Sequence, residues 1–353
     1  MNTRESQEFS NTELQHQQYE KHLPSINNRI LKIQNETLND LSFVQKYQLS
    51  QLYISDCQNI SFQHAFSDAC SFLQVKNCNV QNLDGIEQNK QLQTLYLYDN
   101  LIEDISPLRN LKFLTTLAIN NNKTSDISLL NLLQNLKYLY ANSNNIVDLS
   151  KIEELHFLET LYVSNNKIIS LYGLQNLKYL KELYADRNQI TYLYGIQHLK
   201  NLQMLKLIVN EISDISPVSG CSSLKCLLIN DNQITDVSPL YLNRNLNYID
   251  ISYNFVDSEG FVDLKKLNNI ETMHTLKNKK ASTLQIRLSS RMRFIFQTKC
   301  QLENMKLKRI LISNQFSSTQ NKSKLQLKTL INGQIILSNK LLLVFGTPEQ
   351  ASQ

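Results

Sequence analysis

The sequence predicts a solenoid of stacked coils with short parallel strands, and three regularities predict it. Eight consecutive units of 22 residues cover residues 70 to 245 without insertion or deletion. An asparagine stands at the ninth position of seven of these units, and a glycine or proline at the sixteenth position of six. The whole chain has only seven glycines and five prolines, so the second column marks a turn. A fixed period of this length is typical of stacked repeat proteins.

Each unit contains a strand and a return segment. In residues 94–98, "TLYLY", Leu95 and Leu97 face one way, while Tyr96 and Tyr98 face the other. The return segment 105–111 carries an apolar residue at every third position, which suits a 3₁₀ or extended stretch. We therefore expect an α/β solenoid with a parallel β-sheet on the concave side, 3₁₀ or extended segments on the convex side, and leucines inside each coil.

The asparagine column predicts a structural ladder. An asparagine turned inward at the bend can hydrogen-bond backbone groups of its own and the neighbouring coil that would otherwise be buried unpaired. Cys57 and Cys78 stand at the matching positions of earlier units, where a small and mostly apolar side chain can replace asparagine. The ladder is expected to comprise Asn100, Asn122, Asn144, Asn166, Asn188, Asn210, Asn232 and Asn254.

The repeats become irregular at both ends, which divides the chain into three regions. Units 28–48 and 49–69 are one residue shorter, unit 246–269 is two residues longer, and 270–276 looks like one last strand. The predicted regions are 1–27, a polar N-terminal arm or capping helix (with a short helix at 11–23); 28–276, a solenoid of about ten or eleven repeats; and 277–353, a basic C-terminal segment that is β-rich or irregular.

The charge balance changes at the last of these boundaries. Residues 277–353 contain 14 lysines and arginines and two acids, a net +12, whereas the rest of the chain carries a net −7. Asn332 and Gly333 lie between two apolar runs and predict a hairpin. A basic segment of this kind can bind nucleic acid, an anionic membrane surface or the acidic solenoid, or can simply be a solvated face.

The unit "LQTLYLYDNLIEDISPLRNLKF" (92–113) resembles the leucine-rich repeat, LxxLxLxxNxL, and its length resembles the 22-residue class of that family. The class is typified by the regulatory subunit of protein phosphatase 1 and by bacterial internalins. The resemblance implies a leucine-rich-repeat horseshoe and a non-enzymatic scaffold for protein–protein interaction. A phosphatase regulator would carry concave acidic and aromatic residues every 22 positions. The aromatic half matches here, but few acids share the column.

The fifth repeat position supplies the candidate site. Tyr140, Tyr162 and Tyr184 occupy consecutive coils and should stand side by side at about 4.8 Å on the open concave face. Exposed tyrosines are good anchors for a protein partner, although cross-strand aromatic pairs can also merely stabilise a sheet. Charged neighbours could set specificity. The predicted partner-binding residues are Tyr96, Tyr98, Tyr138, Tyr140, Tyr162, Tyr184, Glu182, Asp186, Arg187 and Lys206.

Other classes of site find little support in the sequence. The six histidines have no serine, cysteine or acid at the spacing of a known catalytic motif, and the seven glycines form no phosphate-binding loop. The six cysteines include no C-x-x-C pair. We therefore expect no catalytic residue, cofactor, metal or small-molecule substrate.

Location and function follow as expectations. The polar N-terminus does not resemble a signal peptide, and the longest clean apolar run, 341–345, is too short to span a membrane. The sequence therefore predicts a cytoplasmic protein with reduced thiols, in which Cys226 faces the concave surface. Its function is expected to be partner binding on the concave face. The alternatives are a phosphatase-1 regulator, or an adaptor to nucleic acid or anionic membrane through 277–353.

Overall fold

The computed structural model describes residues 29–38, 41–63, 70–257, 264, 269–276, 278, 329–331 and 334–336. The chain divides into two units, 1–289 and 290–353, and each is described by itself. The predicted arm or helix within 1–27 lies outside the described residues, and so does most of 277–353. Among the described residues, no helix has the length and apolar character needed to cross a membrane.

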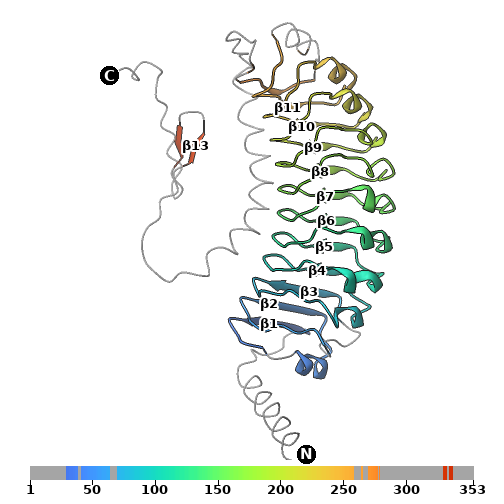
Figure 1. Cartoon of the computed structure of the whole chain (residues 1–353), viewed down its shortest axis with the longest axis vertical. Coiled ribbons are helices and arrows are strands. Elements are labelled where there is room, and N and C mark those ends of the chain that lie inside the picture. The colour runs from blue at the N-terminus through green and yellow to red at the C-terminus, as the bar shows by residue number, and fades with distance from the viewer. Residues whose placement is uncertain are drawn as a thin grey trace, which may run out of the picture. The chain divides into compact units, whose positions relative to one another are not determined.

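The first unit is a leucine-rich-repeat solenoid built on one parallel sheet, as the sequence predicted. Its twelve strands follow one another in chain order, so every strand between the two edges pairs with the strands of the preceding and following coils (Figure 1). The strands are β1 (Ile30–Gln34), β2 (Gln51–Ser55), β3 (Phe72–Lys76), β4 (Thr94–Tyr96), β5 (Thr116–Ala118), β6 (Tyr138–Tyr140), β7 (Thr160–Tyr162), β8 (Glu182–Tyr184), β9 (Met204–Lys206), β10 (Cys226–Leu228), β11 (Tyr248–Asp250) and β12 (Thr272–His274).

The strand register repeats with the sequence period. Tyr140 pairs with Tyr162, and Tyr162 pairs with Tyr184, so residues 22 apart stand opposite one another. Between β1 and β2 the offset is one residue less, with Lys32 opposite Tyr53. The repeat position of a residue therefore fixes the column of the sheet in which it lies.

The return segments form short 3₁₀ helices on the convex side. They are η1 (Ser42–Lys46), η2 (Ile86–Gln88), η3 (Ser106–Asn110), η4 (Ser128–Leu132), η5 (Ser150–Ile152), η6 (Ile196–His198), η7 (Ser216–Gly220) and η8 (Ser238–Leu242). Proline is the second residue of η3, η7 and η8. In three other coils the same repeat position is a glycine with a left-handed backbone. At Gly173, φ is 102°, and an added Cβ would lie 2.4 Å from the carbonyl oxygen of Leu149.

The core is a column of leucines and isoleucines stacked along the solenoid. Leu95, Leu117, Leu139, Leu161 and Leu183 come from the centres of successive strands, and none of them is exposed. Apolar residues of the return segments, such as Ile105, Leu108 and Leu111, close the other side of each coil and are equally buried. Since each coil buries its leucines against its neighbours, stability in such a fold is shared between adjacent coils.

The asparagines of the ladder are buried and fully engaged. The side-chain amide of Asn166 donates to the carbonyl oxygens of Ala141, Val163 and Ser164 at 2.9, 3.0 and 3.3 Å. Its oxygen accepts the backbone N–H of Ile146 at 3.0 Å. The other seven predicted rungs make the same kinds of bond to groups of their own and the preceding coil, and all eight are less than a tenth exposed.

The ladder also extends beyond the predicted rungs. Asn278 donates to Ile251 and Thr275 and accepts the N–H of Val256, although its spacing from Asn254 is 24 residues. At the other end, Cys57 and Cys78 occupy the rung positions and are buried. The thiol of Cys78 accepts the N–H of Cys57 at 3.4 Å.

In the second unit the structure describes one antiparallel pair of strands. These are β13 (Thr329–Ile331) and β14 (Gln334–Ile336), with Ile331 opposite Gln334. The two strands flank the Asn332-Gly333 step at which the sequence predicted a hairpin.

The candidate partner-binding face

Three tyrosines of the fifth repeat position stand side by side on β6, β7 and β8. The ring centroids of Tyr140 and Tyr162 are 5.1 Å apart in an edge-to-face arrangement. Those of Tyr162 and Tyr184 are 4.1 Å apart, with the rings tilted by 39°. Rings at these distances and angles attract one another beyond the area that they bury. The tyrosines therefore form one packed row rather than three independent side chains.

The position of Tyr162 within this row corrects one expectation. The sequence predicted an open concave ring, but Tyr162 is only 9% exposed. A tyrosine flanks it on each side, and its hydroxyl donates to the carboxylate of Glu182 at 3.1 Å. Burial raises the pKa of Tyr162 strongly, and that of Tyr140 to about 12. Tyr162 thus supports its neighbours, whereas the partly exposed Tyr140 and Tyr184 present ring surface.

A second aromatic cluster lies on β2 to β4 and the residues that follow. The ring of Phe72 lies 4.8 Å from that of Tyr53 and 5.4 Å from that of Tyr96, which in turn lies 6.1 Å from Tyr98. Sequence reasoning placed Tyr96 and Tyr98 in the site but missed the contributions of Tyr53 and Phe72. The signal for Phe72 was weak, because the third repeat position holds no regular residue type.

Lysines lie over the outer rings of both clusters. The ammonium of Lys32 lies 5.2 Å from the ring centre of Tyr53, and that of Lys76 lies 5.9 Å from Tyr98. At the far end of the other row, the ammonium of Lys206 lies 5.8 Å from Tyr184. These distances are within the range of cation–π attraction.

The strand between the two clusters carries small side chains. On β5 the fifth repeat position is Ala118, which is 5% exposed. Tyr96 lies on the strand before it and Tyr140 on the strand after it. We call the two clusters together the aromatic stripe. It extends from β2 to β8 and consists of Tyr53, Phe72, Tyr96, Tyr98, Tyr140, Tyr162 and Tyr184.

The predicted charged rim divides into structural and exposed members. Asp186 was expected at the rim, but it is 8% exposed. Its carboxylate accepts the N–H of Ile208 at 2.9 Å and pairs with Lys206 at 2.9 Å. Its primary role is therefore in the fold, which corrects the prediction. Glu182 is tied to Tyr162, and Arg187 is exposed with φ at 52°.

Asp186 belongs to a second, shorter ladder at the seventh repeat position. There the side chain of one coil accepts the backbone N–H of the same position in the next coil. Asn120 accepts from Asn142 at 2.8 Å, Asn142 from Ser164 at 2.7 Å, and Ser164 from Asp186 at 3.1 Å. Small polar acceptors in one column were the available signal, and the sequence analysis did not use it.

Tyr138 lies on β6 at the third repeat position and is half-buried. Cys226 occupies the same position on β10 and was expected to face the concave surface, but it is only 5% exposed. The five cysteines that the structure describes are all buried.

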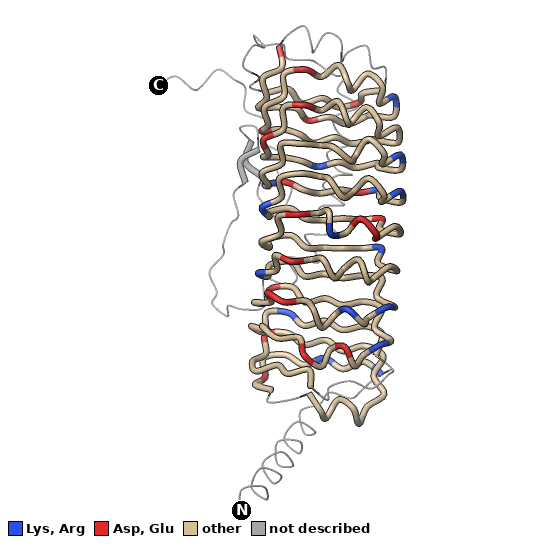
Figure 2. The backbone as a smooth tube through the Cα atoms, turned by 45° about the vertical axis from the view of Figure 1, so that its right-hand side comes forward, with Lys and Arg blue, Asp and Glu red and all other residues tan. Residues whose placement is uncertain are grey.

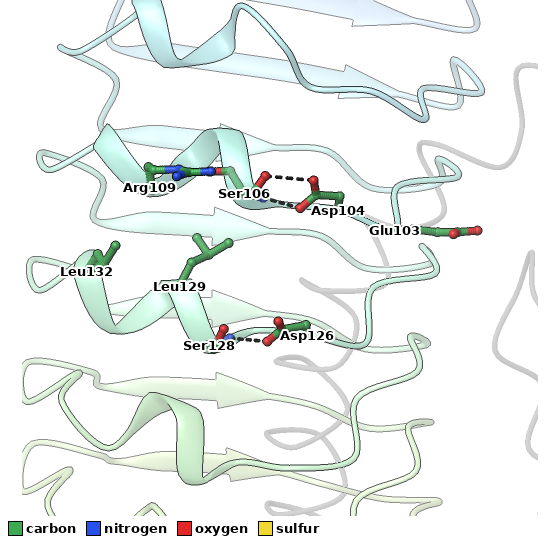
Figure 3. A pocket seen from close by; sticks show the side chains of 8 residues that line it. All are labelled: Glu103, Asp104, Ser106, Arg109, Asp126, Ser128, Leu129 and Leu132. Atoms are coloured by element: carbon green, nitrogen blue, oxygen red, sulfur yellow. Dashed lines mark hydrogen bonds between the residues drawn. The ribbon is translucent and has the colours of Figure 1, made fainter.

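On the convex side, a hollow lies between η3 and η4, lined by Glu103, Asp104, Ser106, Arg109, Asp126, Ser128, Leu129 and Leu132 (Figure 3). Asp104 and Asp126 each accept the N–H of the serine two residues later, at 2.7 and 2.8 Å. The hydrogen bond from Ser128 lowers the pKa of Asp126. These carboxylates stabilise the turns that begin the 3₁₀ helices. Among the described residues, no group of three or more histidines, cysteines or acids could hold a metal.

Comparison with known proteins agrees with this architecture. A family model described as leucine-rich repeats (two copies) matches residues 90–132, 134–178 and 200–242. No curated protein matches the sequence.

Among solved structures, an internalin (inlF) from Listeria monocytogenes is 24% identical, with a TM-score of 0.58 over 72% of this chain and 82% of the other. An internalin C2 (inlC2) from the same species is 33% identical over 52% of this chain and 81% of that one, with a TM-score of 0.49. A plant peptide hormone receptor, RGFR1, solved in complex with RGF2, is 18% identical over 70% of this chain and 47% of its own, with a TM-score of 0.56.

The 22-residue coil, the asparagine ladder, the twelve-stranded parallel sheet and the family match all agree: the chain belongs to the leucine-rich repeat proteins.

Proposed function

We propose that this protein is a scaffold that binds a protein partner on its concave face, through the aromatic stripe. Leucine-rich repeat domains are typically non-enzymatic protein-binding scaffolds. The observation that carries the proposal is the concentration of aromatic side chains on the concave surface of β2 to β4 and of β6 to β8. Tyrosines are enriched among the residues that dominate binding energies at protein interfaces.

The packing of the stripe favours binding at a small entropic cost. Tyr140, Tyr162 and Tyr184 hold one another in place, so little rotamer freedom remains to be lost when a partner docks. The half-buried rings supply apolar area, and their hydroxyls supply hydrogen-bonding groups. Seven strands at about 4.8 Å span about 29 Å, which matches an extended partner segment of about nine residues.

Substitution of the exposed rings tests this proposal. Tyr96→Ser, Tyr140→Ser and Tyr184→Ser together are expected to remove at least one partner captured from native lysate, as measured by quantitative mass spectrometry. The fold should persist, since each lost cross-strand pair costs about 0.2–1 kcal/mol. A control on the convex side replaces the exposed Leu132 and Leu242 by serine. A captured set that is the same for the concave and convex variants would contradict the proposal.

Two alternatives receive less support. A phosphatase-1 regulator would need free acids beside the tyrosines, whereas Asp186 is buried in an ion pair and Glu182 accepts the Tyr162 hydroxyl. An adaptor acting through 277–353 would depend on a segment that lies mostly outside the described residues. A steep salt dependence of binding to anionic vesicles or nucleic acid, lost on deletion after residue 276, would favour it.

A further inference from the structure

One side of the solenoid carries tyrosines where the repeat normally carries an Asp-x-Ser turn. Five coils begin the convex segment with that turn, but two consecutive coils instead read Ser170-Leu-Tyr172 and Tyr192-Leu-Tyr194. Tyr172, Tyr192 and Tyr194 are 51%, 70% and 58% exposed. The rings of Tyr172 and Tyr194 stack at 6.2 Å with an angle of 17°. With the exposed Ile169 beside them, these residues form what we call the tyrosine patch.

Acidic side chains continue the same column on both sides of the tyrosine patch. Asp148 precedes it by one coil and Asp214 follows it by one coil, at the repeat position that Tyr192 occupies. Asp126 and Asp236 extend the column, and all four are exposed. The tyrosine patch is thus an apolar centre with an acidic border.

The opposite side of the solenoid carries aromatic rings with a basic border. Phe157 and Tyr179 occupy the last repeat position, are 51% and 53% exposed, and stack at 5.9 Å. Lysines recur at the position just before them, at Lys112, Lys178 and Lys200, and basic segments follow one margin of the solenoid in Figure 2. We call Phe157, Tyr179 and these lysines the basic aromatic patch.

Two lysines of this basic border are held by backbone carbonyls, and two nearby acids have basic neighbours. The ammonium groups of Lys112 and Lys200 donate to the carbonyls of Leu132 and Gly220 in the next coil, at 3.1 and 2.9 Å. Of the acids near this border, Glu159 pairs with Lys181 at 2.6 Å. Glu154 lies 3.2 Å from His156, whose imidazole carries a charge only when it is protonated. The positive charge of the border therefore comes from Lys112, Lys178 and Lys200.

The two patches lie at opposite ends of the strands and at the same level of the solenoid. The acidic column follows the carboxyl ends of the strands, as Asp104 and Asp126 do in Figure 3, whereas Leu132 and the chain beyond it lead into the amino end of the next strand. Both patches are centred on the coils of β7 and β8. A second copy in the same orientation, shifted sideways, would bring Tyr172 and Tyr194 against Phe157 and Tyr179.

We propose that the tyrosine patch of one molecule docks onto the basic aromatic patch of a second copy of this chain. The rings supply the desolvated centre of the contact, as aromatic side chains do in protein interfaces. The aspartates and lysines recur with one spacing, that of the coil, so matching the columns sets the register. The contact is heterologous, and each pair keeps one free patch at either end. Association therefore continues into longer side-by-side chains.

Sedimentation velocity of the full chain tests the association itself. The mean mass is expected to rise with protein concentration. Because the border is electrostatic, the rise should be smaller at 0.5 M salt than at 0.05 M salt, by roughly tenfold in apparent affinity. A monomer at every concentration and salt level would overturn the proposal.

Two complementary variants test which surfaces meet. Variant one carries Tyr172→Ser, Tyr192→Ser and Tyr194→Ser, and variant two carries Phe157→Ser and Tyr179→Ser. Each alone should be monomeric. Their equimolar mixture should form a 1:1 dimer and nothing larger, because only one intact patch of each kind remains. A mixture that stays monomeric while the wild type associates would overturn the pairing of these two patches.

Two further variants separate this result from misfolding and from partner binding. Asp148→Asn with Asp214→Asn removes two charges of the border but keeps a side-chain oxygen that can accept the N–H of Ser150 and Ser216. This variant should weaken self-association about fivefold with unchanged circular dichroism; undiminished association would contradict the acidic border. The concave variant Tyr96→Ser with Tyr140→Ser should self-associate like the wild type. Self-association that fails only in this concave variant would place the contact on the aromatic stripe and overturn the proposal.

Discussion

The coils at the N-terminus and those in the middle of the solenoid satisfy the buried backbone groups at their bends in different ways. In the middle, strands β4 to β11 are three residues long, and each bend is held by an asparagine whose side chain makes at least four hydrogen bonds, as Asn166 does. In the first coils, strands β1 to β3 are five residues long, and cysteines stand at two bends. A thiol is a weak donor and acceptor and cannot replace the amide bond for bond.

Backbone pairing replaces the missing amides in the first coils. In the middle, the N–H of Ile102 donates to the side-chain oxygen of Asn122. At the equivalent place in the first coil, the N–H of Leu38 donates to the backbone carbonyl of Gln58 at 3.0 Å. Buried N–H groups must find a partner, and a longer backbone ladder can supply it when the side chain does not. An asparagine ladder and a longer backbone pairing between strands are therefore two ways to satisfy the same buried N–H groups.

The largest effect is expected when asparagine and cysteine are exchanged at the positions of the ladder. Asn166→Cys should lower the free energy of unfolding by about 2–4 kcal/mol, because the Ile146 N–H and the Ala141 carbonyl lose good partners in the interior. Cys78→Asn is the matched control and should be neutral or stabilising. Urea unfolding followed by circular dichroism measures both. Equal losses for the two exchanges would mean that the first coils depend on their cysteines as much as the middle coils depend on asparagine.

Features that depend on the backbone of a single coil were predictable from the sequence. The strands, the turn column and the ladder recur because every coil must satisfy the same backbone groups and bury the same leucines. Asn278 escaped prediction because its spacing departs from the repeat, although its hydrogen bonds are those of a rung.

Features that depend on contacts between side chains of neighbouring coils were not predictable in the same way. Alternation correctly assigns Tyr162 to the concave column but cannot show that two flanking tyrosines cover it. Asp186 looks like a rim charge in sequence, and only the neighbouring N–H of Ile208 makes it a structural acceptor. The repeat period therefore predicted which column of the sheet holds the candidate site. The exposure of each residue in that column depends on packing between neighbouring coils, which the period does not show.

A smaller effect is expected at the twentieth repeat position, where two asparagines replace the usual leucine. Asn243 donates to the carbonyls of Val218 and Cys221 at 3.0 and 2.9 Å. Among the described residues, the buried amide of Asn89 makes no hydrogen bond to nitrogen or oxygen and contacts the thiol of Cys70, a weak partner. Asn89→Leu should therefore stabilise by about 1–3 kcal/mol.

The matched change Asn243→Leu should destabilise, since it leaves two carbonyls without their donor. Thermal unfolding of the two variants and the wild type measures whether each change raises or lowers stability. A loss of stability in Asn89→Leu would show that this amide has a partner that the N-terminal coils need, and would weaken the view that these coils rely on backbone pairing.

The smallest expected effect concerns the eighth repeat position, where middle and N-terminal coils agree. The backbone there is left-handed in every coil from Asn77 to Tyr253, and asparagine, aspartate or serine usually occupies it. Val209 is the β-branched exception, with φ at 57° and an exposed side chain. A left-handed conformation costs an L-residue about 1–2 kcal/mol, and asparagine tolerates it better than valine does.

Val209→Asn should therefore raise the free energy of unfolding by about 1 kcal/mol. Asn165→Val, at an exposed position of the same column, should lower it by a similar amount. Denaturant titration at one pH measures both changes. A stabilising Asn165→Val would contradict the backbone argument, because this exchange imposes on a regular coil the residue type that we hold to be strained at Val209.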